Sequence, residues 1–338
     1  MKLVTFAPPH QESRARAGII AGEVVIDIGI ALEAARRHHD IPMPHSLEPL
    51  QSVPLTMGQL LELGQDMMND LDLIVQALLK IWHGQLAETT WAFPAQRVLL
   101  KAPLTEPRTL RDFYAFEAHV RTIRERKGQR VPQEWYEFPA FYFSNTSCIY
   151  GPSEVVPYPS YSSALDFELE IACVIGKKGI DIRVDDAEEY MAGYTIMNDW
   201  SSRDIQEKEV RIGLGPAKAK DFATSLGPYL VTPNELATRK ISPGRYDLPM
   251  SAQVNGIPLS QGNLKDIHWS FCQMIARASQ DAYLYPGAVI GSGTVGTGCI
   301  LELGTERHRW LQPGDRVDLT VDGLGTLSNT VGPPRRGR

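Results

Sequence analysis

Two glutamates separated by one residue, Glu168 and Glu170, have the spacing in this chain that most clearly suggests chemistry. In an extended strand alternate side chains point to opposite faces, so both carboxylates would share one face. The residues between and beside them, Phe167, Leu169 and Ile171, would share the other face and are typical of a core. Two buried carboxylates repel each other, and a hard divalent cation relieves that repulsion. An edge strand with a solvated acidic face explains the same pattern, so both interpretations stay open here.

A second set of polar residues follows about thirty residues later. Asp199, Arg203 and Gln206 are spaced by four and three residues, which would place them on one face of a helical turn after a strand. An N-capped surface helix with an ordinary ion pair gives the same spacing. The pattern therefore indicates a helical turn without deciding between a site and a surface.

Three further segments offer polar groups. Asp112 and His119 are seven residues apart, close to two helical turns, so both would face one cavity if the segment is helical; a histidine that caps or packs a helix start fits equally well. Lys220 lies in a loop bounded by glycine and proline, where a lysine is either a buried cation or solvated. Gly291–Gly298 lacks the lysine of a phosphate-binding loop, so we interpret it as a backbone-lined turn beside a ligand.

The composition is that of a globular enzyme-sized chain. It has 338 residues, of which 43% are hydrophobic, and a formal net charge of -6, which argues against nucleic acid as the main partner. No apolar run approaches the roughly 18 residues that a membrane span needs, and the N-terminus has no apolar leader segment. The cysteines form no C-x-x-C pair, so we expect reduced thiols and a cytoplasmic protein. They are Cys148, Cys173, Cys272 and Cys299.

The order of elements predicts a β-rich α+β protein in two parts, residues 1–97 and residues 98–338. Prolines at 94, 103 and 107 punctuate the connection between them. The small first part is expected to be mixed, with strands at Lys2–Phe6, Gly18–Ile20 and Glu23–Asp27 and helices at Ile30–His38 and Met57–His83. The second part is expected to form a closed or rolled sheet. Its strands are predicted at Glu170–Ile175, Tyr229–Thr232, Met250–Val254, Ala288–Ser292 and Arg316–Val321, its helices at Ala187–Met191 and Asp266–Ala278, and a frayed tail at Gly332–Arg338.

An ordered set of motifs through residues 98–325 resembles the fumarylacetoacetate hydrolase family. They are Asp112-Phe113-Tyr114 with His119, Glu168-Leu169-Glu170, Met197–Gln206, Lys220-Asp221-Phe222, Gly262-Asn263-Leu264, Ser292-Gly293-Thr294 and Leu301-Glu302-Leu303. The resemblance implies a β-roll catalytic domain of largely antiparallel sheets. Longer members carry a smaller, SH3-like N-terminal domain, to which residues 1–95 would correspond.

The resemblance also implies a set of site residues. The metal ligands would be Asp112, Glu168, Glu170 and Asp199, binding Mg²⁺ or Ca²⁺, and Lys220 and Arg203 would offset the excess negative charge. His119 would be the general base and Glu302 the acid that orients it. Arg203, Gln206 and Lys220 would stabilise a developing oxyanion, and Tyr114 and Thr294 would contact the substrate.

The same resemblance favours one activity of several. Decarboxylase-like members carry a glutamate three residues after the histidine, where this chain has Thr122, and they generally lack the acid that Asp112 supplies. We therefore expect a metal-dependent hydrolase that cleaves a carbon–carbon bond in a β-diketo acid, such as a fumarylacetoacetate- or acylpyruvate-like substrate. Val210 stands where the long fumarylacetoacetases carry a substrate-contacting tyrosine.

Alternatives remain. The first is a decarboxylase or isomerase of a 2-oxo acid, such as oxaloacetate or a hydroxy-dienedioate, on the same metal site. The second is a non-catalytic binding protein that keeps the fold and the metal. The expected partners are a small oxo-acid and a second copy of the chain, in a homodimer formed through the large domain near Trp200 and Trp269.

Overall fold

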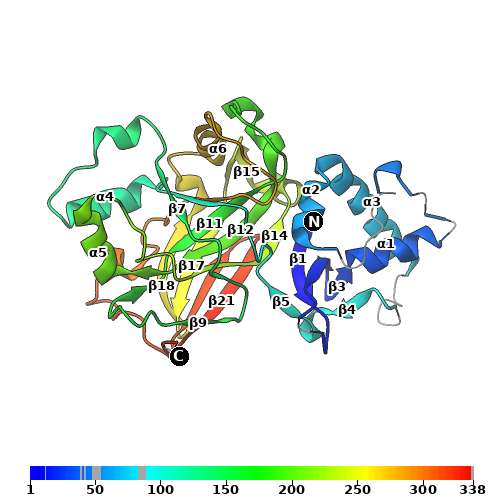
Figure 1. Cartoon of the computed structure of the whole chain (residues 1–338), viewed down its shortest axis with the longest axis horizontal. Coiled ribbons are helices and arrows are strands. Elements are labelled where there is room, and N and C mark those ends of the chain that lie inside the picture. The colour runs from blue at the N-terminus through cyan, green and yellow to red at the C-terminus, as the bar shows by residue number, and fades with distance from the viewer. Residues whose placement is uncertain (12, 39, 42, 48–54, 83–88, 336–338) are drawn as a thin grey trace.

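A long mixed sheet runs through most of the molecule. The computed structural model describes residues 1–335 except 12, 39, 42, 48–54 and 83–88 (Figure 1). Within that range the sheet has twelve strands in the order β4-β3-β2-β1-β14-β12-β11-β19-β6-β7, with β5 beside β1 and β8 beside β14. The strands are β1 Lys2–Ala7, β2 Arg16–Ala21, β3 Val24–Asp27, β4 Ala92–Pro94, β5 Leu99–Lys101, β6 Leu110–Phe113, β7 Phe141–Ser144, β8 Ile149–Tyr150, β11 Leu169–Ile175, β12 Met191–Asp199, β14 Thr224–Val231 and β19 Val289–Gly291.

A second sheet of five strands packs against the central part of the first through a shared apolar core. Its order is β18-β17-β20-β21-β9, and its strands are β9 Val155–Pro157, β17 Pro249–Val254, β18 Ile257–Asn263, β20 Arg316–Val321 and β21 Gly325–Gly332. Two short hairpin-like pairs complete the strands: β10 Leu165–Asp166 with β13 Ser201–Ser202, and β15 Lys240–Ser242 with β16 Arg245–Tyr246. The β-rich α+β class is thus confirmed, and in the described residues the sheets are rolled rather than closed into a barrel.

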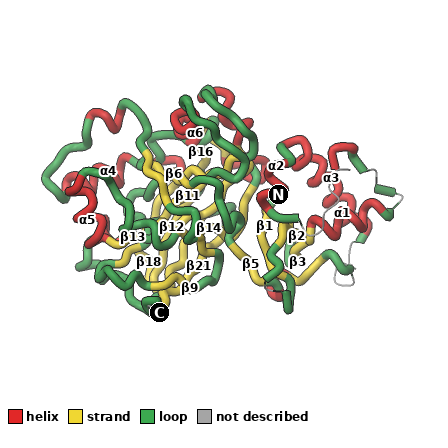
Figure 2. Tube along the Cα trace, in the orientation of Figure 1, coloured by secondary structure: helices red, strands yellow, loops and turns green. Residues whose placement is uncertain are grey.

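The helices lie at the two ends of the molecule and over the sheet margins (Figure 2). The α-helices are α1 Ile28–Arg36, α2 Met57–Glu62, α3 Gln65–Ile81, α4 Glu117–Glu125, α5 Arg203–Ile212, α6 Phe271–Ser279 and α7 Ile300–Leu303. Short 3₁₀ turns occur at His45–Leu47, Ala95–Arg97, Gln133–Tyr136, Val184–Tyr190, Pro233–Arg239 and Leu264–Asp266. None of the helices in the described part of the chain has the length and apolarity to cross a membrane.

Three helix predictions differ from the structure for local reasons. The segment predicted as Met57–His83 is interrupted at Gly64, whose φ of +84° suits glycine and breaks the helix; His83 itself lies outside the described residues. The segment Ala187–Met191 forms a 3₁₀ turn, and Met191 already begins β12. The helix expected from Asp266 begins at Phe271, because Ser270 and Gln273 form a capping box at that point.

The N-terminal segment continues the main sheet instead of standing apart. Strand β1 pairs antiparallel with β14, with Leu3 opposite Leu230. A second apolar core packs α1, α2 and α3 against this end of the sheet and includes Ala172, Val174 and Leu226 from the other part of the chain. A division into residues 1–97 and 98–338 remains a prediction, and the two segments share both a sheet and a core. Of the predicted tail, residues 336–338 lie outside the described range.

Candidate metal centre and catalytic pair

Four carboxylates from neighbouring strands meet in one buried cluster. Asp112 lies on β6, Glu170 on β11, Asp199 at the end of β12, and Glu168 just before β11. One oxygen from each lies within 4.8 Å of the others, and none of the four residues is more than 5% exposed. The sheet order β12-β11-β19-β6 brings them together, although Asp112 and Asp199 are far apart in the sequence.

The position of β11 decides between the two interpretations of the glutamate pair. This strand is hydrogen-bonded to β12 on one side and to β19 on the other, so it is an interior strand. Glu168 and Glu170 are both buried, and both face the cluster. The solvated-edge interpretation is therefore wrong, and the shared face expected from strand alternation is observed.

Two buried cations lie on one side of the cluster. Lys220 Nζ is 2.5 Å from Glu168 Oε2 and 2.5 Å from Asp199 Oδ2, and Arg203 Nη2 is 2.8 Å from Glu168 Oε1. Burial works against ionisation of Glu168, but Lys220 and then Arg203 outweigh it and lower the pKa of this carboxyl. The pKa of Lys220 is raised, because Asp199 and Glu168 outweigh the effect of its own burial.

The pKa values of the other three carboxyls shift in the opposite direction; that of Asp199 is raised by burial even though Lys220 lies beside it. Burial, followed by the charge of Asp199, raises the pKa of Asp112 to about 8. Burial and then Asp112 raise the pKa of Glu170 well above its usual value. Without a bound cation, burial and the neighbouring carboxylates therefore favour the protonated form of Asp112 and Glu170.

The Gly291–Gly298 turn supplies backbone and hydroxyl donors to Asp112 and Glu170. The amide of Gly293 lies 3.1 Å from Glu170 Oε2 and 3.2 Å from Asp112 Oδ1, and the Thr294 hydroxyl donates to Glu170 Oε1 at 3.4 Å. Gly293 has a φ of +75°, and a Cβ there would lie 2.3 Å from the carbonyl oxygen of Phe113. Only glycine fits this turn, and its backbone faces the site as the sequence suggested.

The donor set fits a hard divalent cation. Four carboxylates face two cations, and Arg203 is shared with a further acid, so negative charge is in excess. Asp199 Oδ1 is buried and has no hydrogen-bond partner among the described residues, which leaves one lone-pair site facing the cluster. Oxygen-rich clusters of this kind bind Mg²⁺, Ca²⁺ or Mn²⁺, and a bound cation would replace the protons held by Asp112 and Glu170.

A buried histidine–glutamate pair adjoins the cluster. His119 Nδ1 lies 2.9 Å from Glu302 Oε2, and the two residues are 5% and 6% exposed. After Lys220 and Arg203, His119 is the next residue that lowers the pKa of Glu168, so the pair lies within electrostatic reach of the carboxylates. The Tyr114 ring meets the imidazole edge-on at 5.5 Å between centroids. The expectation that Asp112 and His119 share a helix is wrong, because Asp112 lies on β6 and His119 on α4.

Arg203 connects the cluster to the N-terminus of α7. Its Nη1 donates to Gln206 Oε1 at 2.9 Å within α5, so these two predicted residues lie together. Asp199 belongs to β12 and not to the same helix. Arg203 Nε also donates to Asp166 Oδ2 at 2.8 Å, and Asp166 in turn accepts the amides of Ile300 and Leu301. Asp166 was not predicted, although an aspartate next to a core strand is a signal that could have drawn attention to it.

Tyr142 on β7 was also missed. Its hydroxyl donates to Asp199 Oδ2 and, at 3.2 Å, to Asp112 Oδ2. Strand pairing places it directly opposite Asp112, so its position follows from register and not from any local spacing. Burial and then Asp199 raise the pKa of Tyr142 well above its usual value, which keeps the hydroxyl protonated as a donor.

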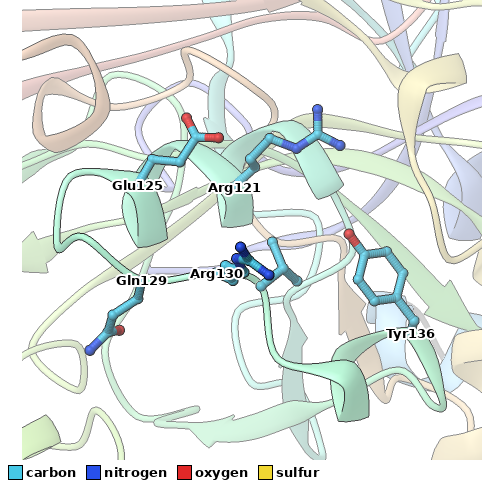
Figure 3. Close-up of a pocket in the computed structure, with 6 residues that line it drawn as sticks. Arg121, Glu125, Gln129, Arg130 and Tyr136 are labelled. Carbon is cyan, nitrogen blue, oxygen red and sulfur yellow. The ribbon is translucent and has the colours of Figure 1, made fainter.

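One surface hollow near α4 lies outside this site. It has a volume of about 280 Å³ and is lined by Arg121, Glu125, Gln129, Arg130, Val131 and Tyr136 (Figure 3). Arg121 and Glu125 are two and six residues from His119 on α4, which places them on the opposite face of the helix. None of the predicted site residues lines this hollow, so it is not part of the candidate site.

The comparison with known families agrees with the motifs. The model of the fumarylacetoacetate (FAA) hydrolase C-terminal domain matches residues 108–332. The chain belongs to the fumarylacetoacetate hydrolase family. It is 31% identical to the mitochondrial oxaloacetate tautomerase FAHD2A of Homo sapiens over 83% of this chain and 81% of that protein. It is 29% identical to the fumarylacetoacetase of Oryza sativa subsp. japonica over 66% of this chain and 67% of that protein.

Among solved structures of this fold, the maleylpyruvate hydrolase of Sphingobium sp. SYK-6 in complex with manganese(II) and pyruvate is similar over 99% of this chain and 100% of that one. Its TM-score is 0.67 at 21% sequence identity, so this likeness shows the fold alone. The family model and the fold therefore identify an enzyme of the fumarylacetoacetate hydrolase family, and the four-carboxylate cluster has the donor set that a divalent cation requires.

Proposed function

We propose that this protein is a metal-dependent tautomerase of a small 2-oxo acid of the oxaloacetate class. The observation that carries the proposal is the buried His119–Glu302 pair beside a four-carboxylate cluster, because keto–enol exchange needs one proton-transfer group next to a cation that stabilises an enolate. The relative named an oxaloacetate tautomerase, at 31% identity over most of both chains, supports the same assignment. This is the isomerase alternative drawn from the sequence, and it now stands ahead of the hydrolase.

The chain's own groups define a proton route. Glu302 holds His119 Nδ1, so Nε2 is the nitrogen left for proton transfer. In the ketonisation direction, His119 Nε2 gives a proton to the substrate carbon next to the oxo group and the enol hydroxyl loses one. Glu302 stabilises the imidazolium that carries the proton between the two positions. The bound cation supplies Lewis-acid polarisation of the oxo group.

The remaining residues bind and orient the substrate in this proposal. With a divalent cation bound among the carboxylates, the buried charges of Lys220 and Arg203 would help to make the site suitable for an anionic substrate, and Gln206 lies beside Arg203. Tyr114 closes one side of the imidazole and Thr294 lies on the Gly293 turn, so both are proposed substrate contacts. Asp112, Glu168, Glu170 and Asp199 are the proposed ligands of Mg²⁺ or Ca²⁺, and Mn²⁺ suits the same oxygen set.

The test follows enol oxaloacetate as it converts to the keto form, by the loss of its ultraviolet absorbance. With Mg²⁺ or Mn²⁺ present, the protein should accelerate this conversion above the buffer rate, and EDTA should remove the acceleration. The Arg121→Ala variant, altered on the outer face of α4, is the matched control and should behave as the unaltered protein. Equal rates for the unaltered protein, His119→Ala and buffer would refute the tautomerase.

Carbon–carbon bond hydrolysis is the second candidate. The same pair favours it, because His119 held by Glu302 can also deprotonate water. Thr122 favours it as well, since it stands where decarboxylase-like members carry a glutamate three residues after the histidine. The relative named a fumarylacetoacetase supports it at lower coverage. A panel of acylpyruvates and β-diketo acids in H₂¹⁸O separates the two: ¹⁸O in a product carboxylate indicates hydrolysis, whereas solvent deuterium on the substrate carbon without cleavage indicates tautomerisation.

A homodimer and a cytoplasmic location complete the proposal. The four cysteines are free, which agrees with a reducing compartment. Trp200 is fully buried inside the described chain, so of the two tryptophans named from the sequence only Trp269, which is partly buried, remains a candidate for a subunit contact. Light scattering that gives twice the 37.6 kDa chain mass would support the dimer, and a mass of one chain would refute it.

A further inference from the structure

Cys299 is a buried thiol to which the proposed reaction assigns no role. It is the residue immediately before α7, is 0% exposed, and lies three residues before Glu302. Its sulfur makes no hydrogen bond within the part of the chain that the structure describes. A buried thiol is an ordinary core group in most proteins, so its neighbours decide whether it has chemistry.

The neighbours of Cys299 are the two members of the catalytic pair. One ligand atom each from His119, Cys299 and Glu302 lies within 4.8 Å of the others, and all three residues are buried. The set combines an imidazole nitrogen, a sulfur and a carboxylate oxygen, whereas the carboxylate cluster offers oxygen alone. Small side-chain adjustments would bring the three atoms to the separations found around one metal ion with bonds of about 2.0–2.3 Å.

We infer that His119, Cys299 and Glu302 form a second metal site, selective for a borderline-soft divalent cation of the Zn²⁺ class and distinct from the four-carboxylate centre. Nitrogen and thiolate ligands favour Zn²⁺ and Co²⁺, whereas Mg²⁺ and Ca²⁺ prefer oxygen. Three protein ligands leave the fourth tetrahedral position for water. On binding, the Cys299 thiol releases its proton to solvent, and the sulfur binds as a thiolate with no change of oxidation state.

The local charges allow this cation. Arg203 faces the group, but its charge is taken up by Asp166 Oδ2 and Glu168 Oε1, each 2.8 Å away. Lys220 also lies 2.5 Å from Glu168, so these two acids and two cations are close to balance, and the Glu302 carboxylate and the Cys299 thiolate supply the negative charge that would hold the ion. The proposed site therefore has ligands of the right softness in an environment that favours a positive ion.

Occupation of this site would inhibit the enzyme. A metal bound to the imidazole makes its lone pair unavailable, and Glu302 could no longer orient the ring for proton transfer. Zn²⁺ should therefore inhibit without displacing the activating cation. This inhibition rests on the proposed function, whereas the existence of the site does not.

Cobalt spectroscopy tests the site without any activity measurement. The protein is first saturated with Mg²⁺, which fills the carboxylate cluster, and Co²⁺ is then titrated. A thiolate-to-cobalt charge-transfer band in the near ultraviolet should appear at one equivalent, since an all-oxygen site cannot give it. Cys299→Ser should abolish the band. Cys148→Ser should leave it, because that cysteine is not a member of the His119–Cys299–Glu302 group, and Glu170→Gln should leave it, because Glu170 belongs to the carboxylate cluster.

The inhibition is measured on the same proteins. With Mg²⁺ saturating, Zn²⁺ should abolish turnover of the unaltered protein. Loss of a residue that only supports a metal ligand lowers metal affinity by about 10- to 100-fold, so loss of the ligand Cys299 in Cys299→Ser should raise the half-inhibitory Zn²⁺ concentration by at least that factor. A test on the unaltered protein does not depend on whether a variant folds. A crystal soaked in ZnCl₂ should show an anomalous-scattering peak between His119, Cys299 and Glu302. No band and no peak would overturn the site, as would a band that survives Cys299→Ser. A band without any tautomerase activity would leave the site standing and refute the proposed function.

Discussion

The Asp166 carboxylate accepts the Nε hydrogen of Arg203 at 2.8 Å. The same carboxylate accepts the amides of Ile300 at 2.8 Å and Leu301 at 2.9 Å, at the N-terminus of the helix that carries Glu302. One buried side chain thus links Arg203, the cation beside the carboxylate cluster, to the short helix whose Glu302 contacts His119. Because Asp166 contacts both sides, a movement of Arg203 would be transmitted to the helix that carries Glu302.

Substitution of Asp166 should lower the free energy of unfolding. Asp166→Ala leaves a buried Arg203 with one acid fewer and removes the acceptor of three backbone amides, those of Phe167, Ile300 and Leu301, so the free energy of unfolding should fall by about 3–5 kcal/mol. Asp166→Asn keeps a carbonyl oxygen that can still accept from the backbone amides, so its loss of unfolding free energy should be smaller. Urea denaturation of both variants measures the effect, with Asp185→Ala as the control, since that side chain is 85% exposed and should change stability by less than about 0.5 kcal/mol. A loss for Asp166→Ala as small as that control would contradict the linking role.

Lys220 should contribute most to the free energy of unfolding when no metal is bound. Lys220→Met leaves Glu168 and Asp199 without their shared cation, and breaking a buried pair in this way costs about 3–5 kcal/mol of unfolding free energy. Added Mg²⁺ should restore part of that loss, because the cation supplies the missing positive charge. Lys218→Met is the matched control: its partner Asp221 is at the surface, and the expected change is below about 0.5 kcal/mol. Equal losses for the two lysine variants in metal-free buffer would refute this assignment.

Metal affinity should rise with pH across the neutral range. The pKa of Asp112 is raised from 3.8 to about 8 in the metal-free protein by burial and by Asp199, so the folded state holds a proton that the unfolded chain has lost. Stability of the metal-free protein should therefore fall as pH rises from about 4 to about 8, since the unfolded state binds fewer protons there. A cation must displace that proton, so its association constant should rise by about tenfold per pH unit below pH 8 for each proton released. Calorimetry in buffers of different ionisation enthalpy counts these protons, and a pH-independent affinity would contradict the proposed ligand.

The histidine and its partner should contribute unequally to the rate. His119→Ala removes the proton-transfer group and should lower kcat by about 10²–10⁴-fold with the metal still bound. Glu302→Gln keeps the imidazole and disturbs only its orientation and charge, so the loss should be smaller and the pH profile of kcat should shift. Equilibrium dialysis against Mn²⁺ confirms that the carboxylate centre is intact in each variant. Near-normal turnover by His119→Ala would remove the pair from the mechanism.

The parts of this site that the sequence predicts are those set by local periodicity or by ordered motifs. Alternation along one strand places Glu168 and Glu170 on one face, and no tertiary information is needed for that. Asp166 and Tyr142 escaped prediction because their partners come from strand register and from a one-turn helix more than a hundred residues away. The position of His119 was misjudged for a related reason: seven residues span two turns only if no strand end intervenes, and β6 ends at Phe113.

The fold was predicted in outline, with errors at helix starts. The Ser270–Gln273 capping box is a readable signal that places the start of α6 at Phe271, yet apolar spacing alone extended the helix back to Asp266. How the two parts of the chain join could not be predicted from spacing, because the pairing of Leu3 with Leu230 depends on contacts across most of the sequence.

The pairing of β1 with β14 also limits how this protein can be divided. A fragment starting near residue 98 would leave Leu230 and Val231 without their β1 partners on one side of β14 and would uncover the apolar side chains of Val174 and Leu226. An exposed edge of this kind is a template for pairing with another chain, so we expect the isolated segment from residue 98 onward to associate more readily than the whole chain. In the whole chain, Lys2 and Leu3 of β1 cover this edge of β14, the strand next to the one that carries Asp199.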